Sequence, residues 1–188
     1  KVLNARQVFD DPKEEHLDFP DSPKVPAVPN WVVSKGATQT QRNPAITKIT
    51  ITESGRYTSI KTIGEAHELE FVVGSKDLVV VVDTLDTLGA VSVKRNGNGA
   101  FYLFAKNAAF KTNTKTFDID VGSGDVVLVF ESLLVENKLN VRNVGATGWF
   151  YLSAENADLH NSVSTLRVNT DDILLRFDTL KMWGSTAW

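Results

Sequence analysis

Three short apolar runs, each bounded by acidic residues, constrain the fold of this 188-residue chain more than any other feature. The runs occupy residues 78–82, 126–130 and 173–177, and each is followed by an acid, a hydroxyl residue and a leucine. Near-continuous apolar segments of this length are typical of β-strands that are covered on both faces. The runs begin 48 and then 47 residues apart, so they indicate an internal repeat.

Six further segments alternate apolar and polar residues with a period of two, which is the pattern of half-buried strands. They are residues 46–52, 67–73, 90–95, 115–121, 138–143 and 164–168. Glycine-rich turns separate the segments, and no stretch has the apolar stripe of an amphipathic helix. The sequence therefore predicts an all-β body of about twelve strands.

Two other elements recur with almost the same spacing. Residues 101–108 (FYLFAKNA) match residues 150–157 (FYLSAENA), and residues 91–94 match residues 139–142. These matches predict about three copies of a four-strand unit, the first of them degenerate. Glycine-rich turns such as the one with Gly97 and Gly99 would then be hairpins. We expect an antiparallel β-sandwich-like body, with a β-trefoil-like barrel as the alternative.

Proline and glycine are sorted by position, which divides the chain into an extended arm, residues 1–44, and a β-rich domain, residues 45–188. All six prolines precede residue 45, and all twelve glycines follow residue 35. Four prolines recur every third residue, which is the period of polyproline II, so they would line one edge of an extended rod. These four are Pro20, Pro23, Pro26 and Pro29.

The arm has three candidate roles. It is a flexible linker, a structural arm that wraps a neighbouring subunit, or a PxxP ligand for an aromatic groove. Val25, Val28 and Trp31 give the arm more apolar surface than a spacer needs, which favours the wrapping arm. The predicted partner-binding residues are Pro20, Pro23, Pro26, Pro29 and Trp31.

The composition excludes several classes of protein. The net charge of −3 provides no electrostatic attraction for nucleic acid or for an anionic membrane. The longest uninterrupted apolar run has five residues, whereas a membrane-spanning helix needs about 20. There is no cysteine, so disulfides, thiolate metal sites and a cysteine nucleophile are excluded. We expect no cofactor, no nucleic-acid partner and no membrane insertion.

The sequence contains no set of residues that suits catalysis. Glu65 and His67 supply two metal ligands at most, and no further histidine lies in a matching position. The acids that flank each apolar run are six residues apart, about 20 Å along a strand, which is too far for the carboxylate pair of a glycosidase. We interpret these acids as structural, with a calcium site in a loop as the alternative. We expect no catalytic residue, no metal site and no enzymatic activity.

Aromatic residues provide an alternative function. Tyr102, Trp149 and Tyr151 lie in or beside the two matching FYL elements, where they could form a platform that stacks against sugar rings. Neighbouring residues in a strand point to opposite faces, so one residue of each Phe-Tyr pair is expected in the core. The alternative prediction is a carbohydrate-binding module with candidate glycan contacts at Trp149, Tyr151 and Tyr102.

A cysteine-free, β-rich repeat body behind a proline-rich arm resembles the structural proteins of virus particles, in particular phage decoration, fibre and tail-appendage domains. The resemblance is carried by residues 20–29, by the ESGRYTS segment at residues 53–59, and by the three apolar runs with their glycine turns. It implies a non-enzymatic structural or attachment protein that forms homo-oligomers. The implied partners are other copies of the chain, other structural subunits or a surface glycan, and the implied location is the virion or the cell exterior.

Overall fold

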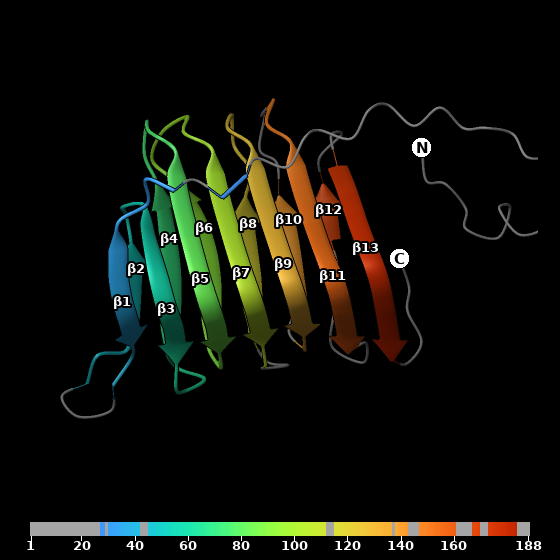
Figure 1. Cartoon of the computed structure of the whole chain (residues 1–188), viewed down its shortest axis with the longest axis horizontal. Helices are drawn as coiled ribbons and strands as arrows, with labels where there is room; N and C mark the ends of the chain where they lie inside the picture. The colour runs from blue at the N-terminus through green and yellow to red at the C-terminus, as the bar shows by residue number, and fades with distance from the viewer. Residues whose placement is uncertain are drawn as a thin grey trace, which may run out of the picture.

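The protein is built from two parallel β-sheets that face each other (Figure 1). The computed structural model describes residues 27–28, 30–41, 45–111, 115–136, 138–142, 147–160, 167–169 and 173–183. The seven-stranded sheet contains β1 (Ser34–Gln39), β3 (Gly55–Thr62), β5 (Leu78–Thr87), β7 (Phe101–Phe110), β9 (Val126–Val135), β11 (Phe150–His160) and β13 (Ile173–Trp183). The six-stranded sheet contains β2 (Lys48–Ile51), β4 (Glu68–Val73), β6 (Ala90–Arg95), β8 (Thr116–Asp120), β10 (Lys138–Arg142) and β12 (Arg167–Asn169).

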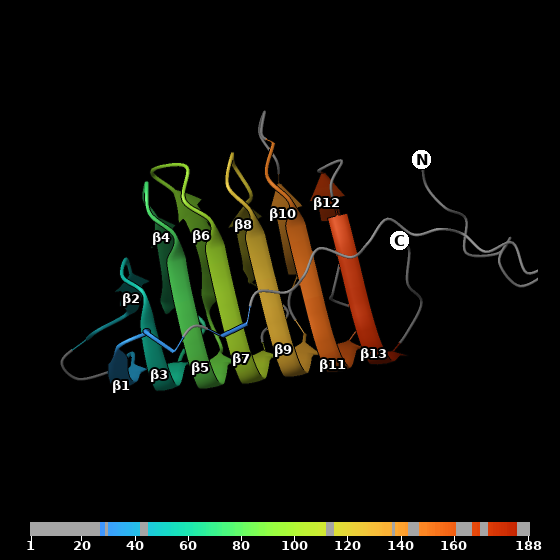
Figure 2. The same ribbon diagram turned by 45° about the horizontal axis from the view of Figure 1, so that its top comes forward.

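Successive strands alternate between the two sheets, so the chain winds as a β-solenoid in which each coil supplies one strand to each sheet. Figure 2 shows the two sheets as separate layers. All neighbouring strands within each sheet are parallel. The predicted antiparallel sandwich and the trefoil alternative are therefore wrong. The all-β class is confirmed, but alternation of apolar and polar residues is the same in parallel and antiparallel strands and does not reveal their direction.

The repeating unit is one coil of two strands, not the predicted unit of four strands. Leu78, Phe101, Val126, Phe150 and Ile173 are register partners on successive strands, and they are 23 to 25 residues apart in sequence. The 48-residue spacing of the apolar runs therefore spans two coils. The FYL elements begin β7 and β11, which lie between the strands that carry the three runs, β5, β9 and β13.

The core lies between the sheets and is made of rows of apolar side chains that stack from coil to coil. Inward-facing residues of both sheets belong to one cluster, which includes Ile60, Leu103 and Leu128 of the large sheet and Phe71 and Ile119 of the small one. Aromatic rings join the layers: the ring centroids of Phe71 and Phe101 are 5.0 Å apart. Burial of these apolar rows between the sheets provides the hydrophobic stabilisation of the folded state.

Glycines at the turns permit successive coils to stack closely. A Cβ atom added at Gly124 would lie 2.3 Å from the carbonyl oxygen of Gly99, and one added at Gly148 would lie 2.5 Å from the carbonyl oxygen of Gly124. Among the described glycines only Gly36 and Gly122 have a positive φ. The hairpin interpretation of Gly97 and Gly99 is therefore wrong: these turns connect one sheet to the other, and their glycines remove side-chain bulk between coils.

Polar side chains fasten the same turns to one another. The Asp77 carboxylate accepts a hydrogen bond from the backbone N–H of Ala100 at 2.9 Å, and Asp125 accepts one from Trp149 at 3.0 Å. The Arg95 guanidinium donates to the carbonyl oxygens of Asp120 and Gly124 at 3.0 and 2.8 Å. Asp77 and Asp125 therefore each hold one turn against the following coil, and Arg95 adds a third link between turns.

An N-terminal segment crosses the outer face of the seven-stranded sheet before the first strand begins. We call the described residues 27, 28 and 30–33 the strap; it runs in front of the sheet in Figure 1. β1 follows within the range predicted as arm and pairs with β3. Pro20, Pro23, Pro26 and Pro29 lie outside the described residues.

Replacing Gly124 by alanine should lower the free energy of unfolding by roughly 1–3 kcal/mol, because the new methyl group would overlap the backbone of the preceding coil. Gly74→Ala is the matched control, since a Cβ atom there meets nothing within 4 Å. Chemical denaturation of both variants gives the comparison. Equal losses of stability in the two variants would contradict the stacking role of the turn glycines.

Candidate functional site

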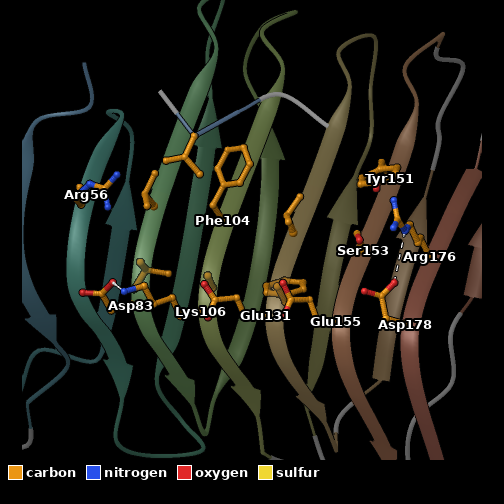
Figure 3. Close-up of a pocket in the computed structure, with 16 residues that line it drawn as sticks. Arg56, Asp83, Phe104, Lys106, Glu131, Tyr151, Ser153, Glu155, Arg176 and Asp178 are labelled. Carbon is orange, nitrogen blue, oxygen red and sulfur yellow. Dashed lines mark ion pairs between the residues drawn. The ribbon is translucent and has the colours of Figure 1, made fainter. Parts of the chain in front are cut away.

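A pocket of about 490 Å³ lies on the outer face of the seven-stranded sheet, where side chains from β3 to β13 and from the strap converge (Figure 3). Strand alternation places every second residue of the first half of each long strand on this face, up to the point where inward residues become three apart, as at Val82 and Leu85. Because successive coils are in register, equivalent outward residues form three transverse rows.

The first row is largely aromatic and aliphatic. Val79, Tyr102, Val127 and Tyr151 are consecutive register partners. Tyr151 lines the pocket and is 4% exposed, while Tyr102 is half-buried. Burial raises the pKa of the Tyr102 hydroxyl, and the nearby Asp77 and Asp125 carboxylates add to the effect. The row therefore has a largely dry, apolar character despite facing outward.

The second row has an apolar centre with an arginine at each end. Val81, Phe104 and Val129 are register partners and form the centre. Arg56 precedes them on β3, and Arg176 follows them on β13. The row thus combines an apolar floor with guanidinium groups that can donate several hydrogen bonds each.

The third row is charged and consists of Asp83, Lys106, Glu131, Glu155 and Asp178. The Nζ atom of Lys106 is 3.3 Å from Oδ1 of Asp83, and the Nε atom of Arg176, in the second row, is 3.7 Å from Oδ1 of Asp178. Glu131 and Glu155 form no ion pair with another described residue. Four carboxylates and three cations, Arg56 included, give the pocket a net charge of −1.

The charged row is not apparent in the sequence, because its members lie on different coils and are distant along the chain. Along the strand, Asp83 and Glu131 each follow an acid six residues earlier, at the opposite end of the same run. In the structure their true neighbours are residues one coil away, at about 4.8 Å per strand. A repeat of 23 to 25 residues, had it been recognised, would have aligned Asp83, Lys106, Glu131 and Glu155 directly.

The three predicted glycan contacts are only partly brought together. Tyr102 and Tyr151 occupy the same row, two strands apart, and Tyr151 alone lines the pocket. Trp149 lies at the entry to β11, is 43% exposed and is not part of the pocket lining. The core prediction for the Phe-Tyr pairs is correct for Phe101 and Phe150, both fully buried.

Of the predicted partner-binding residues, only Trp31 is described. Its side chain is 62% exposed, whereas the neighbouring Val32 is 7% exposed and packs on the sheet. Val32, Val79, Val81 and Phe104 form a second apolar cluster, separate from the main core. The strap therefore presents Trp31 to solvent while Val32 anchors it.

Outside the pocket, His67 and Glu70 have structural partners. The Nδ1 atom of His67 is 2.6 Å from the Thr40 hydroxyl oxygen, and His67 is buried. On the outer face of the small sheet, the Lys94 ammonium group bonds to the Glu70 carboxylate and holds the pKa of that carboxyl below its ordinary value. Lys48, whose Nζ atom is 3.1 Å from Glu70 Oε2, lowers the pKa further. In the described part of the chain, no three potential ligands gather as a metal site.

Comparisons of this chain with known protein families, with curated proteins and with solved structures find no match. Over the described residues there is no helix with the length and apolar character needed to cross a membrane. The pocket is therefore interpreted from its own chemistry.

Replacing Lys106 by methionine should lower the free energy of unfolding by about 0.5–1 kcal/mol at low ionic strength, because Lys106 is the only cation in the third row. At 1 M salt most of the loss should vanish, since the Debye length falls to about 3 Å. Denaturation of the variant in both buffers measures this. Lys76→Met, in an exposed turn outside the row, is the control. A loss of stability in Lys106→Met that does not depend on salt would contradict the role of the charged row.

Proposed function

We propose that this protein is a non-catalytic attachment module that binds a neutral oligosaccharide on the outer face of its seven-stranded sheet. The observation that carries the proposal is the pocket in which an apolar floor with aromatic rings adjoins a row of charged hydrogen-bonding groups (Figure 3). Binding sites for small molecules commonly combine an apolar lining with a few well-placed polar groups.

The polar groups suit a ligand that is rich in hydroxyl groups. Carboxylates such as Glu131 and Glu155 accept hydrogen bonds from hydroxyls, while Arg56 and Arg176 donate hydrogen bonds to sugar oxygens. Phe104 and Tyr151 line the pocket but are only 6% and 4% exposed, so their apolar faces would meet the carbon atoms of a pyranose ring once the side chains that cover them move aside. The four carboxylates disfavour a polyanionic glycan by charge repulsion. These features support a neutral sugar chain as the ligand.

The exposure of the carboxylates supports binding rather than hydrolysis. A carboxylic acid that acts as general acid near neutral pH is usually held in an apolar, water-excluded environment. The Asp83 and Asp178 side chains are 47% and 59% exposed, so water reaches both. An attachment role needs only the hydrogen-bonding row and the apolar floor.

The chain should bind hexamers of glucose or N-acetylglucosamine. A variant with both Glu131→Gln and Glu155→Gln should bind the preferred hexamer at least about tenfold more weakly, because each charge-assisted hydrogen bond is worth about 1.5–3 kcal/mol. Isothermal titration calorimetry measures both. Glu68→Gln is the control, since its exposed carboxylate lies on the other sheet. Tight binding of a sulfated oligosaccharide instead of the neutral ones would refute the proposed ligand class.

A second candidate function, self-assembly, is favoured by the last strand. β13 pairs with β11 on one edge, and no described strand pairs with its other edge. Leu180 and Trp183 on this strand are 40% and 57% exposed. At the opposite end, β1 has the polar sequence SKGATQ. An open edge with apolar side chains is a typical surface for strand addition, so it supports contacts with other copies of the chain or with other structural subunits.

If β13 mediates assembly, the protein should form dimers or larger species at micromolar concentration, and Leu180→Lys should shift the population to monomer by removing apolar contact and adding charge repulsion. Sedimentation velocity over a concentration series measures the mass. Leu88→Lys, which changes a similarly exposed leucine elsewhere on the body, should leave the mass unchanged. A purely monomeric parent chain would eliminate this candidate.

A further inference from the structure

We infer that the strap is a built-in cover of the carbohydrate-binding face, and that ligand and strap compete for the same apolar floor. This inference rests on the proposed function and adds regulation to it. The strap is the only described segment outside the sheets that contributes to the pocket lining, through Val28. It therefore forms part of the wall of the pocket that a sugar ring would enter.

The anchoring contact is apolar and specific. Val32 is 7% exposed and packs against Val79, Val81 and Phe104, which are outward-facing residues of β5 and β7. Outward-facing Val79 and Val81 are themselves 4% and 7% exposed, although an open sheet face would leave them accessible to water. The strap therefore accounts for a dry region on a face that would otherwise be wet.

The covered region and the pocket are one continuous surface. Phe104 belongs to the cluster beneath Val32 and also lines the pocket. Val81 does the same. Val28, upstream in the strap, lines the pocket together with Tyr151 of β11. Because Phe104 is only 6% exposed with Val32 packed against it, a sugar ring that stacks on its face would have to displace part of the strap.

The strap is attached in a way that permits release without loss of the sheet. Trp31 and Val33 on either side of Val32 are 62% and 66% exposed, so a single buried side chain anchors this stretch. The carbonyl oxygen of Val33 accepts a hydrogen bond from the backbone N–H of Arg56 at 2.8 Å, and β1 begins at the next residue. Lifting the strap as far as Val32 would therefore break a small apolar contact and leave both the Val33–Arg56 hydrogen bond and the β1–β3 pairing in place.

Competition has a thermodynamic consequence in both directions. A ligand that binds only the uncovered face shifts the strap toward release, and a weakened strap raises the apparent affinity for that ligand. Because burial of a valine side chain is worth roughly a factor of ten in an equilibrium constant, loss of the Val32 contact should change affinity by about that factor.

The experiment uses the absence of cysteine from the chain, which makes a single introduced thiol a clean reporter. Val81→Cys places a thiol beneath the strap, and its rate of reaction with a soluble disulfide reagent reports exposure. We expect slow labelling with Val32 in place and at least about tenfold faster labelling when Val32→Asp is added. Val80→Cys, on the inward side of the same strand and fully buried, is the control for global unfolding and should label slowly in both backgrounds.

The same variants separate the two proposals. Val32→Asp should bind the glucose or N-acetylglucosamine hexamer about tenfold more tightly than the parent chain does. If Val81→Cys labels equally fast with and without Val32→Asp, the strap is not a cover and the inference is overturned, whatever the sugar does. If labelling accelerates and both chains bind the hexamer equally, competition is overturned. If labelling accelerates and neither chain binds any neutral hexamer, the cover stands as a structural feature and the proposed carbohydrate function fails.

Discussion

Close stacking of one coil on the next is the constraint on which this structure depends. Parallel strands separated by about 4.8 Å leave no room for side chains where the turns cross, so Gly99, Gly124 and Gly148 occupy that position in three successive coils. Asp77 and Asp125 then bond two of these turns to the following coil. With the turns fixed in this way, equivalent residues of successive coils fall into register and the apolar rows meet inside.

The same stacking produces the candidate site. Register turns one outward residue per coil into a continuous row, so residues about 24 positions apart in sequence become neighbours in space. Glu131 and Glu155 lie side by side for this reason, and so do Phe104 and Val129. A flat, regular face of this kind presents repeated groups to a repeated ligand, which is the physical basis for proposing a sugar chain. The strap adds control, because Val32 covers one end of the apolar floor.

The sequence predicts the β class and the existence of a repeat, but not the topology. Alternating and continuous apolar segments identify strands correctly, since burial depends on side-chain direction alone. They cannot distinguish a strand that returns beside its predecessor from one that passes to the opposite sheet. Gly97 and Gly99 illustrate the difficulty: glycine serves a hairpin and a tightly stacked turn equally well. The site was predictable only in part. Of the three residues predicted as glycan contacts, Tyr151 alone lines the pocket, and the charged row becomes visible only with the correct coil length.

Coil register is the central claim, and a distance between two spin labels tests it most directly. Thr84 on β5 and Thr179 on β13 are equivalent positions linked through successive register partners, with four strand spacings between them. Labels attached to cysteines at these two positions of the cysteine-free chain should give one narrow distance distribution, centred near about 19 Å plus the reach of the labels. A broad distribution, or a distance far from that value, would contradict the stacked parallel coils and with them the rows that form the site.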